Sequence, residues 1–279
     1  MATFTQGDYT YAYDTGSVEL AVEATDKTKT SYGTIPAYIN YNNTLFVVTG
    51  ATECFKNCTN LTSVGGLPHT LTYMDYCFQG CTSLVNAPQV PYGVIHMESC
   101  FRDCTSLVNA PVIPASVYYA NYAFSGCTNL EGYVFIDPRG YVVARSEGLA
   151  ASFNFIFYNT NLAKDIYVYL VGTHGQETSM SFKQSDIRSS ILHGAGHNVK
   201  FMCEPQDKIT YNKASTYMLN KDSSGAIRQT SLCPETNANI IQVEIPAVTH
   251  RGGYNEQGSK LRVSLYDALM DLENRTMGR

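Results

Sequence analysis

A 23-residue period is the feature of this sequence that most limits how the chain can fold. Between Cys54 and Leu130, phenylalanine recurs at this period, a cysteine follows each phenylalanine by three residues, and a leucine follows each cysteine by three more. These three columns are Phe55, Phe78, Phe101 and Phe124; Cys58, Cys81, Cys104 and Cys127; and Leu61, Leu84, Leu107 and Leu130. A fixed period of this length predicts a solenoid, because each unit can bury its apolar face only against the next unit.

Further positions are apolar in every unit and complete the predicted core. They are Val64, Ala87 and Ala110; Leu67, Val90 and Ile113; Leu71, Val94 and Val117; and Met74, Met97 and Ala120. We expect the phenylalanine rings to stack along the interior as a spine. Pro88 and Pro111 cannot donate a backbone hydrogen bond, so each unit is expected to hold a strand of only about three or four residues.

A second cysteine column consists of Cys54, Cys77 and Cys100, with Ala123 at the fourth position. Free cysteine packs well as a small hydrophobe, and we predict that both cysteine columns face inward without a metal. The alternative is a ladder of disulfides or metal ligands, since neighbouring units would lie about 4.8 Å apart. The alanine speaks against a ligand set, and the Cys-x3-Cys spacing is not that of a zinc knuckle.

The phrase Phe-x-x-Cys-Thr-Ser-Leu-Val-x-Ala-Pro-x-x-Pro in these units resembles the BspA-type leucine-rich repeat, also called the Treponema-type repeat. The resemblance covers roughly 100 of the 279 residues. It implies a short concave-side strand at residues 61–67 and at the equivalent places, and a helical turn on the convex side around residues 76–80. Such a repeat defines a scaffold and not an activity.

The segments on either side of the repeats favour a mixed, β-rich α+β fold. Residues 1–50 contain alternating strands, for example at 9–13, 38–41 and 45–48, and we predict that they form a β cap on the first unit. The repeats occupy residues 51–136. The predicted fold is therefore a short leucine-rich-repeat solenoid with a β N-terminal cap and, over residues 137–279, a C-terminal α+β region that ends in a helix.

The C-terminal region is expected to begin with a degenerate fifth unit. Residues 155–162 repeat the pattern, with Asn159 in place of the cysteine and with Leu162 placed 32 residues after Leu130. Further strands are predicted at residues 166–172, 199–203 and 240–245. The last element is a helix around residues 264–272, whose apolar stripe would pack on this chain or on another subunit.

Composition excludes several classes of function. Charged residues make up 15% of the chain and the net charge is -5, which does not suit nucleic-acid binding. The N-terminus lacks a secretory signal pattern, and no run of about 18 apolar residues predicts a membrane span. We therefore expect a chain that folds in a cytoplasm.

No catalytic or cofactor motif is present, so we predict a protein without enzymatic activity, cofactor or metal. The most metal-like place is His193-Gly194-Ala195-Gly196-His197, but its glycines disfavour the helix on which two histidines could share a zinc ion. We interpret this segment as a turn and keep a metal site as the alternative.

The candidate binding surface consists of exposed columns on consecutive units. One column is Tyr73, His96 and Tyr119, a second is Asp75, Glu98 and Asn121, and a third is His69 and Tyr92. Aromatic ladders can stack on sugar rings or contact proteins, and these columns are our candidate recognition residues. The alternative is that tyrosine only covers the surface of a sheet.

Two interpretations of the function follow. The first is a structural component of a bacteriophage virion, in a head or tail fibre, with the repeats as decoration or host contact. The alternative is a BspA-like surface adhesin or protein-interaction module of a bacterium or protist. The expected partners are other protein subunits, in a homo-oligomer or a particle, and a glycan or protein on a host surface.

Overall fold

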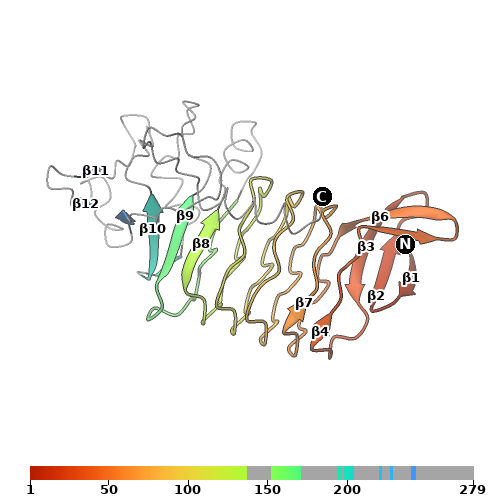
Figure 1. The fold of residues 1–279 in the computed structure, drawn as a ribbon, viewed down its shortest axis with the longest axis horizontal. Coiled ribbons are helices and arrows are strands. Elements are labelled where there is room, and N and C mark those ends of the chain that lie inside the picture. The colour runs from red at the N-terminus through yellow and green to blue at the C-terminus, as the bar shows by residue number, and fades with distance from the viewer. Residues whose placement is uncertain are drawn as a thin grey trace, which may run out of the picture.

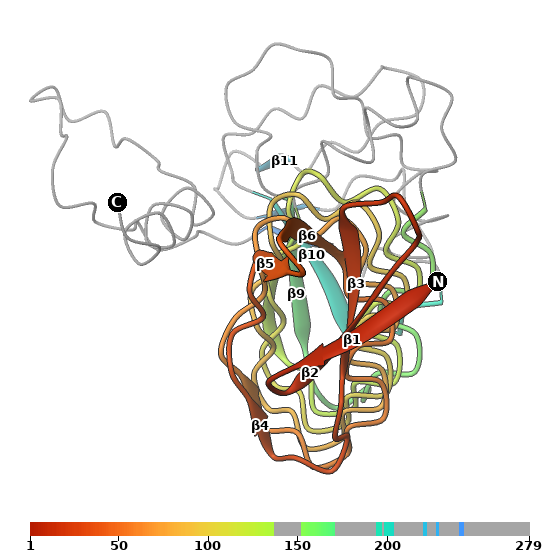
Figure 2. The ribbon, with the colours of Figure 1, turned by 90° about the vertical axis from the view of Figure 1, so that its right-hand side faces the viewer.

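The fold is a row of stacked coils between two β-sheets (Figure 1). The computed structural model describes residues 1–136, 152–170, 194–196, 198–203, 220–221, 227–228 and 240–242. Seen along the stack, successive coils superpose behind the N-terminal sheet (Figure 2). The 23-residue period therefore corresponds to one coil of a solenoid.

The N-terminal end is a five-stranded sheet with the order β1-β2-β3-β6-β5. Its strands are β1 Ala2–Gln6, β2 Tyr9–Tyr13, β3 Glu19–Ala24, β5 Tyr38–Tyr41 and β6 Thr44–Gly50. Alternate residues of β3 are buried, as a strand with one face on the core requires. The strands predicted at 9–13, 38–41 and 45–48 are confirmed. The short strands β4 (Ser31–Tyr32) and β7 (Ser63–Val64) pair in parallel at the first coil.

Each coil is tied to the next by a regular set of backbone hydrogen bonds. The amides of Met74, Tyr76 and Phe78 donate to carbonyls of the following coil at 2.8–2.9 Å. The alternating amides of Cys77 and Gln79 donate instead to carbonyls three residues earlier in their own coil. This segment is a series of turns, so the helical turn expected around residues 76–80 is wrong: every second amide is used between coils and is not available to a helix.

The turns place two residues of each coil in the left-handed region. The second of each pair is Asn57, Gly80, Asp103, Gly126 or Asn159, with φ between 58° and 75°. Asparagine, aspartate and glycine are the residue types that tolerate this conformation. The column was visible in the sequence as a recurring Asn, Asp or Gly immediately before the cysteine or its equivalent.

Gly80→Ala is expected to lower the free energy of unfolding by about 1–2 kcal/mol, because a Cβ is disfavoured in the left-handed region. The added Cβ would also lie 2.5 Å from Oδ1 of Asn57 on the preceding coil. Urea unfolding followed by circular dichroism measures the change. Gly66→Ala is the control, because a Cβ there meets nothing closer than 3.6 Å. Equal midpoints for the two variants would contradict this role of Gly80.

The phenylalanine column forms a continuous stack inside the coils. Ring centroids lie 5.1 Å apart from Phe55 to Phe78, 5.2 Å from Phe78 to Phe101 and 5.6 Å from Phe101 to Phe124, with interplanar angles of 17°, 3° and 10°. All four rings are fully buried. The leucines Leu61, Leu84, Leu107 and Leu130 are equally buried. By contrast Val64, Ala87 and Ala110 are only partly buried, so this column borders the core and does not fill it.

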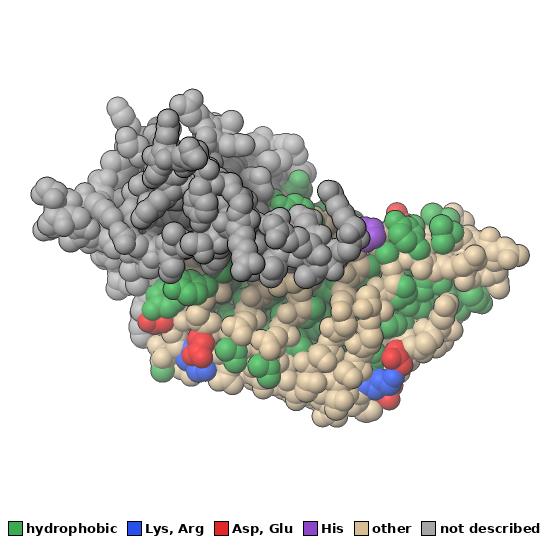
Figure 3. All heavy atoms as spheres, viewed as in Figure 1, with side chains coloured by type: hydrophobic (Ala, Val, Ile, Leu, Met, Phe, Trp, Pro, Cys, Tyr) green, Lys and Arg blue, Asp and Glu red, His purple; other side chains and the backbone are tan. Residues whose placement is uncertain are grey.

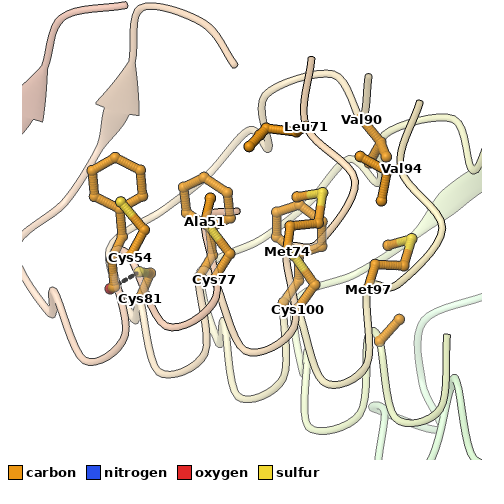
Figure 4. Packing of buried hydrophobic residues seen from close by; sticks show 14 of the residues in the cluster. Ala51, Cys54, Leu71, Met74, Cys77, Cys81, Val90, Val94, Met97 and Cys100 are labelled. Atoms are coloured by element: carbon orange, nitrogen blue, oxygen red, sulfur yellow. Dashed lines mark hydrogen bonds between the residues drawn. The ribbon is translucent and has the colours of Figure 1, made fainter. Parts of the chain in front are cut away.

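The cysteine columns run beside the rings, with Cys54, Cys77 and Cys100 in file (Figure 4). All seven repeat cysteines are free and buried. In the other column the thiols of Cys81, Cys104 and Cys127 each donate to the carbonyl of a phenylalanine on the preceding coil, at 3.0–3.1 Å. The thiols therefore act as small core side chains that also satisfy a buried carbonyl.

The repeat thiols are expected to resist alkylation in the folded chain. Burial raises the pKa of Cys58 to about 11 and raises those of Cys77, Cys81, Cys100 and Cys104 as well. The reactive thiolate at pH 8 is then about 100-fold scarcer than in a free cysteine. Iodoacetamide treatment at pH 8, followed by peptide mass spectrometry, should leave these sites unmodified until denaturant is added. Rapid labelling of any of them in the native chain would contradict their burial.

A fifth coil follows after an insertion, one residue out of the predicted register. Phe157 stacks on Phe124 at 6.0 Å, and the two are 33 residues apart. Thr160 therefore takes the place of the cysteine and is buried, whereas Leu162 is 54% exposed. The predicted assignment of Asn159 to the cysteine position is wrong: Asn159 has φ 58° and belongs to the left-handed column.

Proline limits the length of the strand that follows the leucine column. In the middle coils this place holds only a single bridge between Asn86 and Asn109, so the strands are shorter than expected. Pro88 and Pro111 follow these bridges, and in the next coil Val134 stands in the same column. With an amide restored there, the chain forms the five-residue strand β8 (Gly132–Ile136).

Strand β8 opens a parallel sheet at the far end of the coils, with the order β13-β10-β9-β8. Its other strands are β9 (Ile166–Leu170), β10 (Val199–Cys203) and β13 (Ile240–Gln242), and strands were predicted at all three places. A small hairpin pairs β11 (Asn220–Lys221) with β12 (Ile227–Arg228).

The β-rich character of the predicted fold is confirmed, but its helical part is not. Residues 1–136 and the shorter described segments form strands, bridges and turns, and no helix occurs among them. The helix expected at 264–272 lies outside the described residues. Nor is there, in the part of the chain that the structure describes, a helix suited to spanning a bilayer. The division at residues 50 and 136 stays a prediction.

Candidate functional site

Tyr73, His96 and Tyr119 lie side by side on consecutive coils, and we call these three residues the ladder. Parallel backbone bridges join Gly50 to Tyr73, Tyr73 to His96, His96 to Tyr119 and Tyr119 to Ser152. In a parallel register, residues paired in this way project their side chains from the same face of the sheet. The period of the sequence thus fixes three aromatic side chains in one row on a rigid backbone.

The ladder rings lie close together along the row, tilted at the first step and stacked at the second. The ring centroids of Tyr73 and His96 are 5.2 Å apart, and those of His96 and Tyr119 are 4.3 Å apart with an interplanar angle of 23°. Tyr73 remains 46% exposed. Tyr119 therefore covers one face of the His96 ring, whereas the Tyr73 ring is tilted against His96 at 37°. The outer faces of the end rings, beside Gly50 and Ser152, have no ring partner within the row.

The second predicted column, Asp75, Glu98 and Asn121, is called here the acidic column. Two of its side chains also bind backbone amides of the next coil. Asp75 Oδ1 accepts a hydrogen bond of 2.7 Å from the amide of Glu98 on the next coil. Asn121 Oδ1 accepts one of 2.8 Å from the amide of Asn154 in the same way. These side chains therefore continue the backbone bonding between coils, a role that sequence reasoning had not assigned to them.

Two carboxylates of this column lie beside the ladder without a lysine or arginine partner among the described residues. Asp75 Oδ2 is 3.9 Å from Nδ1 of His96, and Glu98 Oε1 accepts a hydrogen bond of 3.3 Å from the Tyr76 hydroxyl. Burial raises the pKa of Asp75, although the amide of Glu98 and the nearby His96 oppose this shift. Charged side chains are sparse on the described part of the face in Figure 3. The ladder thus has a local negative charge.

The third predicted column does not extend the ladder. The His69 ring lies 6.1 Å from that of Tyr38 in β5, so it faces the N-terminal sheet. Tyr92 is 47% exposed. We therefore treat the first two columns as the candidate site and these two residues as its neighbours.

A second aromatic column was missed by sequence reasoning. Tyr76, Tyr122 and Phe155 occupy equivalent positions of the turns, each with φ of 57°, and the last two rings stack at 5.0 Å. Lys56 lies 5.4 Å from the centroid of the Tyr76 ring, and Arg102 lies 5.7 Å from that of Tyr122. The unit between carries Ser99, which hid the column in the sequence.

The possible metal site remains untested. His193 and His197 lie outside the described residues. Within the described parts of the chain, no three or more His, Cys, Asp or Glu side chains come together as metal ligands would.

Comparisons with known proteins identify the repeats. Residues 39–138 match the family described as the BspA type leucine rich repeat region, in 6 copies. No curated protein matches the sequence.

Three solved structures resemble parts of the chain. A leucine rich cell surface protein from Faecalibacterium prausnitzii is 21% identical over 61% of this chain and 45% of its own length, with a TM-score of 0.44. A leucine rich repeat protein from T. pallidum is 21% identical over 46% of this chain and 68% of its own, with a TM-score of 0.33. One from Bacteroides ovatus is 16% identical over 59% and 55%, with a TM-score of 0.30. The chain spans less than half the length of the first of these proteins. Residues 39–138 are a BspA type leucine-rich repeat region.

Proposed function

We propose that this chain is a non-enzymatic recognition module that binds a protein partner through the ladder. One observation carries the proposal: Tyr73, His96 and Tyr119 form a partly exposed aromatic row whose backbone is fixed by bridges on both sides. Little conformational entropy is lost when such a row is covered, and tyrosine is enriched where proteins bind one another. Residues 39–138 match a leucine-rich repeat family, and stacked repeats present extended surfaces suited to binding other proteins.

The ring geometry supports a protein partner over stacked sugars. A sugar ring stacks on an open aromatic face, whereas the 4.3 Å stack of His96 on Tyr119 closes these two faces to each other. The exposed edges of the row offer hydrogen-bonding groups at neighbouring coils. Such a row suits the polar groups and side chains of a polypeptide.

The family match supports a surface or protein-interaction module better than a bacteriophage virion component. The virion interpretation includes contacts with other subunits, for which the helix expected at 264–272 is a candidate. That helix lies outside the described residues, and the repeat type supports the alternative. We therefore propose a surface adhesin or interaction module.

The test is a selection of binding peptides from a random display library on the intact chain. The comparison variant carries Tyr73→Ser, His96→Ser and Tyr119→Ser. Serine suits this column, because Ser152 occupies it in the fifth coil. The control carries Asn86→Ser and Asn109→Ser on the other row of bridges, where the two amides bond at 3.0 Å.

We expect selected peptides to bind the wild type and the asparagine control alike. Binding to the ladder variant should fall by about 30-fold or more, because losing one aromatic hot spot already costs about 2 kcal/mol. Circular dichroism must show that all three chains are folded. Peptides that bind the ladder variant as tightly as the wild type would overturn the proposed site.

A further inference from the structure

We infer that the partner segment held by the ladder is basic, with arginine or lysine side chains directed at Asp75 and Glu98. This inference rests on the proposed function and names the chemistry of its partner. Three features of the site lead to it: the charge beside the row, the unused capacity of the carboxylates, and the open face of the end ring.

The charge beside the row selects against apolar and acidic partners. A partner that covers the ladder also covers Asp75 and Glu98, since these residues stand two positions after Tyr73 and His96 on the same coils. Burying a carboxylate without a cation is costly, and burying it against another carboxylate is more so. A cation in the partner removes this cost, and it provides specificity by excluding partners that lack it.

The two carboxylates keep acceptor capacity for such a cation. Asp75 uses one oxygen for the amide of Glu98, and its other oxygen is 3.9 Å from His96, beyond hydrogen-bond distance. Among the described residues, the Glu98 carboxylate receives only the long 3.3 Å bond from the Tyr76 hydroxyl. A guanidinium group has five N–H donors and can bridge carboxylates on neighbouring coils.

The open face of Tyr73 offers a second place for a cation. Its neighbour in the row is Gly50, which pairs with Ala21 of β3, and neither of these residues has a large side chain beside the ring. A lysine or arginine of the partner can lie over the face at about 6 Å from the ring centroid. The chain itself forms contacts of this kind, with Lys56 over Tyr76 at 5.4 Å and Arg102 over Tyr122 at 5.7 Å.

The experiment measures peptide affinity by fluorescence anisotropy on the intact chain. The probes are an arginine-containing peptide from the display selection and its copies with citrulline or glutamate at each arginine. The test variant is Asp75→Asn with Glu98→Gln, which removes both charges. Asparagine keeps the bond to the next coil, as Asn121 shows in the same column. The control, Glu53→Gln with Asp103→Asn, removes two charges that pair with Lys56 and Arg102 instead.

We expect the test variant to bind the arginine peptide about tenfold more weakly than the wild type, and the control to bind it like the wild type. Citrulline should cause a similar loss, and added salt should weaken binding to the wild type. Selected peptides that need the ladder but lack basic residues, or equal affinity for the test variant, would overturn the inference while the recognition function stands. If the control variant lost as much affinity as the test variant, the attraction would come from the net charge of the chain. This result would also overturn the inference. Failure of the ladder variant to lose binding would overturn both.

Discussion

Replacing Phe78 by alanine is expected to lower the free energy of unfolding by about 3–5 kcal/mol, the usual cost of removing a buried aromatic ring. The ring is fully buried and is stacked at 5.1 Å on Phe55 and at 5.2 Å on Phe101. Its loss leaves a cavity and breaks the stack between two pairs of coils. In a repeat protein this weakens the interfaces between neighbours, on which the whole stack depends.

Urea unfolding followed by far-ultraviolet circular dichroism measures this loss. Phe78→Leu is the matched control, because it keeps a large apolar side chain and removes only part of the volume. The leucine variant should be clearly more stable than the alanine variant. An unfolding midpoint of the alanine variant equal to that of the wild type would show that Phe78 is not in the core.

Cys104→Asp should be as damaging, at about 3–5 kcal/mol, because it places an unpaired carboxylate in the interior. The thiol of Cys104 is fully buried and donates to the Phe78 carbonyl at 3.0 Å, so the introduced group meets an acceptor and no cation. Burial raises the pKa of the introduced carboxyl, so the folded chain binds a proton that the unfolded chain releases. Stability should therefore fall as the pH rises from acid to neutral.

Cys104→Thr is the control for this substitution, and the chain itself suggests it. Thr160 takes the cysteine position in the fifth coil, is buried, and donates from its hydroxyl to the Phe157 carbonyl at 3.2 Å. Thermal unfolding at pH 5 and pH 7.5 compares the two variants. If the aspartate variant matched the threonine variant at both pH values, the thiol columns would not be core.

The repeats were predictable because each of their features recurs. Phe55, Phe78, Phe101 and Phe124 stand at one period, and a column of identical rings can be buried only if the coils stack. The interior position of the thiols followed from Ala123, which a packing column accepts and a metal-ligand column does not. The family resemblance rested on the same recurring residues, and the match over residues 39–138 confirms it.

The sequence-based predictions were wrong where a feature occurs only once in the chain, or where it depends on hydrogen bonds that residue types do not reveal. An insertion separates Phe124 from Phe157, and a pattern alone cannot tell which residue after it resumes the register. The helical turn at 76–80 failed because bonds between coils compete for the same amides. The length of β8 depends on Val134 standing where earlier coils have Pro88 and Pro111.

The candidate site was predictable in its position but not in its chemistry. A period of 23 places Tyr73, His96 and Tyr119 in one row, but only the ring geometry shows that His96 stacks on Tyr119. The bond from the Glu98 amide to Asp75 likewise depends on side-chain geometry, which residue spacing does not give. These two observations direct the proposal away from sugar stacking and toward a basic polypeptide.

The most direct test of the recognition surface is a map of where a bound peptide touches the chain. A selected peptide carrying a photoreactive benzophenone is bound to the intact wild type and irradiated, and the crosslinked residues are identified by mass spectrometry. The ladder predicts crosslinks at Tyr73, His96 and Tyr119. Crosslinks confined to the other row of bridges, at Asn86 and Asn109, would contradict it.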